Sequence, residues 1–225
     1  MHPELHEAWI RIKDLGLGAL AHGNYHAGYL SMHEMARWSE LSVLQAAHAA
    51  ELLIKARISQ EHPLLIFDQL PKPSKNNATK LDLEFLATNG KTLQWNELPD
   101  RLWATTGITF PSKKTFEEFG RLRNGLQHFG ISSSPHPAIE SLNFIYSCID
   151  PFINLCWGLF AIDYDEDYDP GIYLPQTLIS LEIPFLVSPQ CAMNFSEWGI
   201  ELSGKSADYR IEMEKRISEA AQKIQ

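Results

Sequence analysis

Cysteine is scarce in this sequence. Its 225 residues include three cysteines, Cys148, Cys156 and Cys191, an odd number without any C-x-x-C spacing. Disulfide frameworks and structural zinc sites need paired or closely spaced cysteines. We therefore expect reduced thiols in the core and no zinc site.

Neither a signal peptide nor a transmembrane segment is expected from the sequence. The first residues, MHPELHEAWIRIKD, lack the basic start and apolar run of a signal peptide. The most apolar stretch, residues 142–162, is interrupted by Asn143, Asp150, Pro151 and Asn154. A transmembrane helix needs about 20 mostly apolar residues. We therefore expect a cytoplasmic protein with no membrane partner, in which residues 142–162 form a buried helix pair.

Positive charge is in short supply, and its distribution is uneven. The formal net charge is −9, and residues 136–225 hold only 5 of the 19 basic side chains but 14 of the 28 acidic ones. Residues 1–135 are balanced. If the protein has a nucleic-acid surface, we expect it in this first part, where Lys113, Lys114, Arg121 and Arg123 cluster.

The chain does contain strong helical patterns. Leu44, Ala47, Glu51, Ile54 and Ile58 step by three and four and define one helix face, and Pro63 should end that helix. Similar reasoning predicts helices at residues 4–21, where glycines should end the helix, and at 31–60, 81–88, 95–104, 112–129 and 137–160. Pro151 should kink or divide the last of these.

The pattern changes after Ala161. An acidic turn segment, DYDEDYDPG, is followed by an alternation of apolar residues from Ile179 to Phe185 that predicts an edge strand weakened by Pro184. A final amphipathic helix is expected from Ser206. We predict a mainly α fold, with a helical domain over residues 1–161 and a small mixed α/β C-terminal appendage over 162–225.

The stretch RLRNGLQHFG, residues 121–130, places polar side chains on the helix expected at 112–129. Ser112 is the expected N-cap and Gly130 the expected C-terminal stop. Asn124 and His128 are four residues apart and share a face, whereas Arg123 and His128 lie about 140° apart around the helix axis. A site that uses both residues is therefore easier to build where two helices or two subunits meet.

The chemistry of RNA cleavage suits these side chains. The 2′-hydroxyl must lose a proton when it attacks the phosphate, and the leaving 5′-oxygen must gain one, which a histidine can serve at neutral pH. A guanidinium matches the negative charge that develops on the phosphate oxygens. Arg123, His128 and Asn124 are thus candidate catalytic residues, without a metal or other cofactor. The alternative is an ordinary polar helix face.

The segment Arg123-Asn124-x-x-x-His128 resembles the R-x(4–6)-H signature of the HEPN superfamily (higher eukaryotes and prokaryotes nucleotide-binding domains). A second motif, HAAELLIKARI, resembles the early helix of that family, with Glu51 and Lys55 at the acidic and lysine positions. The likeness covers about residues 31–161. One feature departs from a toxin subgroup, since Gly130 stands where that subgroup has a tyrosine.

The resemblance implies an up-down four-helix bundle that forms a homodimer, with both R-x4-H helices lining one cleft. It implies a metal-independent endoribonuclease that leaves 2′,3′-cyclic phosphate and 5′-hydroxyl ends and acts as a toxin or phage-defence effector. Its partner would be an antitoxin or another defence-system protein. The alternatives are a non-catalytic HEPN-like dimer that binds a nucleotide or a protein, and a helical scaffold without a site.

Other candidates have simpler explanations. Glu51 either supports Arg123 and His128 or forms an ion pair with Lys55 at i+4, and we expect Arg121, Lys113 and Lys114 to bind RNA. A metal face made of His22, His26 and His33 is not expected, because Gly23 and Gly28 make a continuous helix doubtful and no carboxylate completes the set. The acidic segment lacks the glycine and the closing glutamate of a calcium loop.

Overall fold

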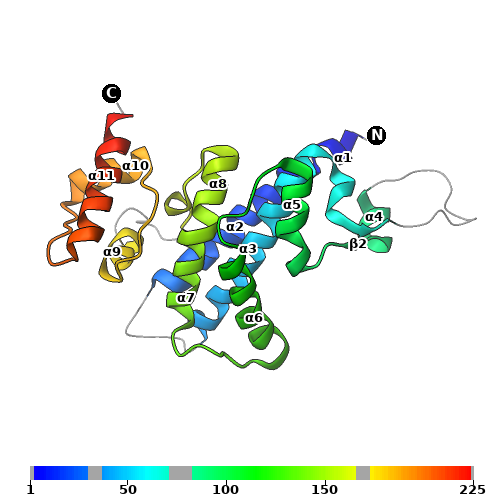
Figure 1. Cartoon of the computed structure of the whole chain (residues 1–225), viewed down its shortest axis with the longest axis horizontal. Helices are drawn as coiled ribbons and strands as arrows, with labels where there is room; N and C mark the ends of the chain where they lie inside the picture. The colour runs from blue at the N-terminus through cyan, green and yellow to red at the C-terminus, as the bar shows by residue number, and fades with distance from the viewer. Residues whose placement is uncertain (1–2, 30–36, 71–82, 166–172, 224–225) are drawn as a thin grey trace, which may run out of the picture. The chain divides into compact units, whose positions relative to one another are not determined.

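The computed structural model describes residues 3–29, 37–70, 83–165 and 173–223, and it is mainly helical (Figure 1). The helices in chain order are α1 (Pro3–His6), α2 (Ala8–Gly28), α3 (Trp38–Glu61), α4 (Leu83–Asn89), α5 (Leu98–Thr106), α6 (Lys113–Phe129), α7 (Pro137–Phe144), α8 (Asp150–Trp157), α9 (Tyr173–Ser180), α10 (Pro189–Trp198) and α11 (Ala207–Gln222). Short 3-10 turns are η1 (Pro63–Ile66), η2 (Trp95–Glu97) and η4 (Ala161–Asp163), and η3 (Ile145–Ile149) is a π-helical turn.

The chain divides into two compact units. The first combines Met1–Gly16 with Ala50–Phe110, and the second combines Leu17–Ala49 with Pro111–Gln225. In the first unit, β1 (Phe67–Gln69) and β2 (Lys91–Thr92) form an antiparallel pair, the only sheet among the described residues. The domain boundary expected at residues 161–162 lies inside the second unit and stays a prediction. No helix in the described part of the chain is both long and apolar enough to span a membrane.

Helix α2 does not end at its first glycines, so that expectation is wrong. It runs through Gly16, Gly18 and Gly23 and stops at Gly28. A Cβ atom at Gly16 would lie 3.0 Å from Cγ of Leu53 on α3. A glycine at this position therefore allows close helix packing, and the packing of α2 outweighs the low helix propensity of glycine.

Helix α3 is buried on more sides than its apolar stripe suggested. Ala47, Ile54 and Ile58 are buried as expected, but so are further apolar side chains around the helix, namely Val43, Ala46, Ala49, Ala50, Leu53 and Ala56. Buried apolar side chains on several sides of a helix are typical of a helix in the protein interior. The expected start at Ser31 lies outside the described residues, and the expected end before Pro63 is confirmed.

Helix α6 begins and ends where its capping residues predicted. Ser112 Oγ accepts a hydrogen bond from the Thr115 N–H at 3.3 Å. Gly130 has a φ of 62°, and its N–H donates to the Leu126 carbonyl oxygen at 3.0 Å. The predicted apolar face is buried, comprising Phe116, Phe119, Leu122 and Leu126. The phase of this helix is therefore fixed at both ends and along its length.

The predicted effect of Pro151 is present as a π turn. Residues Ile145–Ile149 form η3 between α7 and α8, and Pro151 occupies the first turn of α8. A proline cannot donate to the carbonyl four residues earlier, so the wider turn accommodates it without ending the helical path. The helix was expected to reach about Phe160 but stops at Trp157, because Gly158 follows with a φ of 67°.

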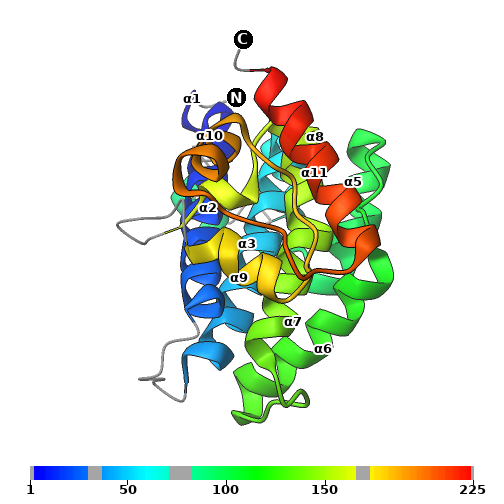
Figure 2. The same ribbon diagram turned by 90° about the vertical axis from the view of Figure 1, so that its left-hand side faces the viewer.

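The edge strand predicted over Ile179–Phe185 is wrong, and no strand is present among the described residues of 162–225 (Figure 2). Ile179 belongs to α9, and the chain turns at Glu182, which has a φ of 53°. Side chains instead of a strand partner satisfy the following backbone. Tyr209 donates to the Ile183 carbonyl oxygen at 3.3 Å, and Arg216 donates to that of Phe185 at 2.7 Å.

Asp150 at the start of α8 accepts hydrogen bonds from two segments that follow α8 later in the sequence. Its Oδ1 accepts the Ala161 N–H and its Oδ2 accepts the Leu186 N–H, both at 2.8 Å, and the residue has no exposed surface. Burial raises the pKa of Asp150 to about 7, even though these hydrogen bonds act in the opposite direction. The C-terminal helices are thus attached to α8 by a buried carboxyl group.

Candidate functional site

Arg123 lies at an open groove in the second unit. The groove has a volume of about 320 Å³, and its lining comes from two helices: Leu44, Gln45 and His48 on α3, and Arg123 and Gln127 on α6. Arg123 and Gln127 are four residues apart, as are Leu44 and His48, so each helix presents one face to the groove. Arg123 and Gln45 are half-buried, whereas His48 and Gln127 are exposed.

The side chains that line this groove supply hydrogen-bond donors and positive charge but no negative charge. Its lining contains a guanidinium, an imidazole and two side-chain amides, and it contains no carboxylate. Arginine is always charged and presents donors in a planar fork, and glutamine amides and imidazoles also donate hydrogen bonds. Such a groove suits a ligand that is anionic and rich in acceptor oxygens.

Asn124 is positioned to orient the guanidinium. Nη1 of Arg123 donates a hydrogen bond to Oδ1 of Asn124 at 3.0 Å. Asn124 itself is exposed on the neighbouring face of α6. The structure therefore brings together two of the residues predicted for catalysis.

His128 is not among the residues that line the Arg123 groove. Its side chain is exposed near the end of α6, and its ring lies edge-on to that of Phe129, with 6.4 Å between the ring centroids. Helical geometry puts His128 on the Asn124 side of α6, about 140° from Arg123. In a single copy of the chain, the groove and the imidazole therefore occupy different faces.

The basic residues predicted to bind RNA lie at the surface of α6. Oε1 of Glu118 is 4.0 Å from Nζ of Lys114 and 3.9 Å from Nη2 of Arg121. Exposed ion pairs of this kind contribute little energy, so both cations can turn toward an anionic ligand. Lys113 is also exposed, on the first turn of α6.

Glu51 belongs to the first unit and forms the expected ion pair. Nζ of Lys55 donates to Oε1 of Glu51 at 2.7 Å and also reaches Thr92 Oγ1 at 3.3 Å. Lys55 is buried, with 7% of its surface exposed. Because a buried ammonium needs a charged partner, Glu51 has a clear structural role, and its catalytic role stays a prediction.

The histidines on α2 form an aromatic cluster. His22 and His26 are stacked with 6.1 Å between ring centroids, and the His26 ring lies 5.4 Å from that of Trp38. His33 falls outside the described residues, as does most of the acidic segment DYDEDYDPG. Across residues 3–29, 37–70, 83–165 and 173–223, no group of three His, Cys, Asp or Glu side chains is arranged to hold a metal ion.

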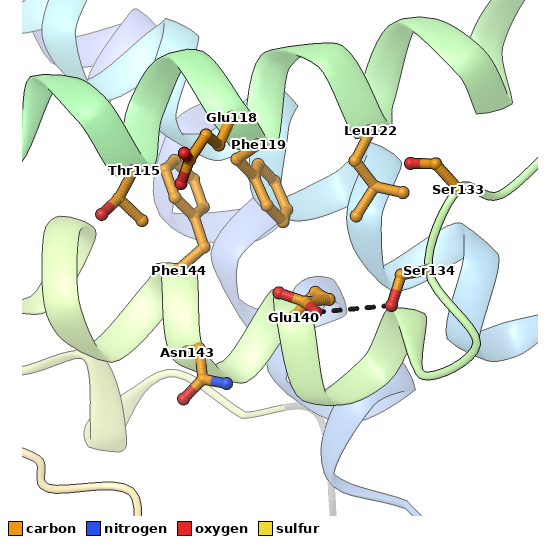
Figure 3. A pocket seen from close by; sticks show the side chains of 9 residues that line it. All are labelled: Thr115, Glu118, Phe119, Leu122, Ser133, Ser134, Glu140, Asn143 and Phe144. Atoms are coloured by element: carbon orange, nitrogen blue, oxygen red, sulfur yellow. Dashed lines mark hydrogen bonds between the residues drawn. The ribbon is translucent and has the colours of Figure 1, made fainter.

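A second hollow lies between α6, α7 and the linker that joins them (Figure 3). Its volume is about 260 Å³, and its lining consists of Thr115, Glu118, Phe119, Leu122, Ser133, Ser134, Glu140, Asn143 and Phe144. The buried rings of Phe119 and Phe144 are stacked at 3.9 Å, and Ser134 donates to Glu140 at 3.4 Å. The two carboxylates make this hollow unfavourable for phosphate.

Sequence reasoning missed three polar residues of the Arg123 groove: Gln45, His48 and Gln127. One signal was available, since His48 stands between two pairs of alanines, Ala46–Ala47 and Ala49–Ala50, in the middle of α3. Nothing in the sequence indicates that His48 lies near Arg123, because this depends on how α3 packs beside α6. The comparisons with protein families, curated proteins and solved structures gave no match.

Proposed function

We propose that this protein is a HEPN-type endoribonuclease that cuts RNA without a metal ion and serves as a toxin or phage-defence effector. The observation that carries the proposal is the Arg123–Asn124 hydrogen bond of 3.0 Å, which orients a guanidinium beside a groove free of carboxylates. Helices α3, α6 and α7–α8 follow one another along the chain in the order that the HEPN resemblance implies.

Each residue has a defined role in the proposed reaction. The RNA 2′-oxygen loses its proton and bonds to phosphorus, the bond from phosphorus to the 5′-oxygen breaks, and that oxygen gains a proton. His128 transfers a proton in this sequence, and Arg123 stabilises the negative charge on the phosphate oxygens. The products are a 2′,3′-cyclic phosphate and a 5′-hydroxyl. Arg121, Lys113 and Lys114 bind neighbouring phosphates of the strand.

In a homodimer, Arg123 and His128 of one site can come from different copies, so their angular separation on one helix does not keep them apart. A phosphate held by Arg123 of one copy is reached by His128 of the second copy. Phe129 and Ile131, which lie one and three residues after His128, have 77% and 64% of their surface exposed. In the proposed dimer, the partner covers these two apolar side chains at the end of α6.

The test is cleavage of single-stranded RNA in the presence of EDTA. Because a positioned general acid or base contributes about 10²–10⁴-fold, His128→Ala should lower the rate by that factor. Arg123→Ala should lower it by about 10²–10³-fold through loss of charge stabilisation. His136, exposed before α7 and outside the groove, supplies the control variant His136→Ala, which should cut at the wild-type rate.

Mixing the two inactive variants tests the shared site. A dimer of Arg123→Ala with His128→Ala contains one intact Arg–His pair if the pair is formed across the interface. Random re-association should then restore about a quarter of the wild-type activity, because half the dimers are mixed and each has one complete site of two. Activity lost in EDTA, or equal activity in wild type and His128→Ala, would contradict the mechanism.

A non-catalytic binding module is the second candidate. The observation that favours it is the exposed position of His128 outside the Arg123 groove. In this case the protein binds a nucleotide or a partner protein without cutting it. Arg123→Ala would then weaken ligand binding, while expression of wild type and of His128→Ala would affect cell growth equally.

A further inference from the structure

His48 faces the same groove as Arg123, although it belongs to neither of the motifs on which the proposed function rests. It approaches from α3, whereas Arg123 and Gln127 approach from α6. Donor groups therefore line both helical sides of one concave surface. The side-chain amide of Gln45, three residues before His48 on the same helix, extends the donor set.

The side chains that line the groove favour an anionic ligand. A phosphate diester offers two unesterified oxygens that share a negative charge, and these oxygens accept hydrogen bonds from arginine, imidazole and amide donors. The lining contains no carboxylate that would repel them. The hollow beside α7, in contrast, carries Glu118 and Glu140 (Figure 3). Of these two depressions, the Arg123 groove is the one suited to an RNA backbone.

We propose that His48, with Gln45 and Gln127, completes a phosphate-binding subsite around Arg123, and that this subsite holds the backbone of single-stranded RNA. The choice of RNA rests on the proposed function. His48 binds the phosphate from the wall opposite Arg123 and fixes the strand against α3. Leu44 supplies the apolar part of the same wall, against which a sugar or base edge can pack.

The experiment measures binding separately from cleavage. The probe is a fluorescein-labelled single-stranded RNA of ten nucleotides in which every 2′-oxygen is methylated, so that the attacking hydroxyl is absent and the strand stays intact. Fluorescence anisotropy gives the Kd for wild type and variants at fixed salt, because phosphate contacts depend strongly on ionic strength. Far-UV circular dichroism verifies that each variant is folded.

Two substitutions address the subsite, and each has a matched control. His48→Ala removes one donor to a charged oxygen and should raise Kd about tenfold or more, whereas His136→Ala should leave Kd unchanged. Gln127→Glu puts a carboxylate into the groove and should also raise Kd about tenfold or more. Gln222→Glu adds the same charge at an exposed position near the end of α11 and should have little effect.

The outcomes separate this proposal from the proposed function. If wild type binds the methylated RNA and both groove variants weaken binding while the controls do not, the subsite is supported, even when unmodified RNA is not cut. If His48→Ala and Gln127→Glu both bind like wild type, the subsite is refuted, even when unmodified RNA is cut in a His128-dependent manner. Failure of wild type to bind the probe refutes it as well.

Discussion

Replacing Asp150 by asparagine tests whether a buried carboxyl group attaches the C-terminal helices to α8. The two carboxyl oxygens accept the Ala161 and Leu186 N–H groups at 2.8 Å each. Asparagine has the same shape but only one oxygen. It can accept one of these N–H groups, and its own NH₂ group must then face the other donor. The substitution leaves one backbone donor without its acceptor, either the buried Ala161 N–H or the part-buried Leu186 N–H.

The magnitude of this loss follows from the geometry. An unsatisfied buried donor costs about 1–3 kcal/mol, so Asp150→Asn should lower the free energy of unfolding by about 2 kcal/mol at pH 5. At that pH the folded wild type keeps Asp150 mostly protonated, because burial raises its pKa to about 7. The comparison at pH 5 is therefore between two neutral side chains.

The difference should shrink as the pH rises. An aspartate in the unfolded chain has a pKa of about 3.9, well below the folded value of about 7. Between these values the unfolded state releases the proton and the folded state retains it, so wild-type stability falls with rising pH. From pH 5 to pH 8 this loss amounts to about 3 kcal/mol. Asparagine does not titrate and escapes it, so at pH 8 the variant should equal or exceed wild type.

Urea unfolding followed by circular dichroism at pH 5, 6, 7 and 8 measures the difference. Asp208→Asn, an exposed substitution in the first turn of α11, controls for the change in net charge and should show no comparable trend. A stability difference that stays constant across this range would refute the raised pKa. A difference that grows with pH would show that the carboxylate is stabilised in the folded state.

Two further predictions test local features. Gly130→Ala should lower the free energy of unfolding by about 1 kcal/mol, because Gly130 has a φ of 62°, although a Cβ atom there meets nothing within 4 Å. Gly18 is equally open but lies inside α2. Gly18→Ala should therefore raise the free energy of unfolding by about 0.5–1 kcal/mol in the same urea assay. Equal effects of these two substitutions would contradict the conformational argument. Burial raises the pKa of Cys148 to about 11 and that of Cys191 to about 12. A disulfide reagent at pH 8 should therefore modify half-buried Cys156 first. Peptide mapping measures the order of modification, and a faster reaction at Cys191 would refute the prediction.

Local signals were sufficient to predict α6. A hydroxyl at Ser112, a glycine at Gly130 and apolar residues at steps of three and four determine its start, end and buried face without reference to the rest of the chain. The same local logic failed at α2, where the close approach to Leu53 makes glycine favourable inside a helix. It also failed at Ile183–Phe185, because side chains from α11 satisfy a backbone that looked like a strand.

The candidate site divides in the same way. Helical spacing predicts that Asn124 shares a face with His128, but it does not predict the hydrogen bond that Asn124 accepts from the adjacent Arg123. The relation between Arg123 and His48 depends on the packing of α6 beside α3, which no periodicity within either helix specifies. His48, more than seventy positions before Arg123 in the sequence, therefore lines the groove although it belongs to no recognisable motif.

The phase of α6 also constrains any mechanism. Its two caps and its buried apolar face prevent rotation about the helix axis, so Arg123 and Gln127 stay at the groove while His128 stays about 140° away from Arg123. A phosphate that contacts Arg123 inside the groove cannot also receive His128 from the same helix without a large change in side-chain direction. In the proposed mechanism, cleavage would therefore need a second copy to supply the imidazole, whereas the proposed phosphate subsite would need only the donors of α3 and α6.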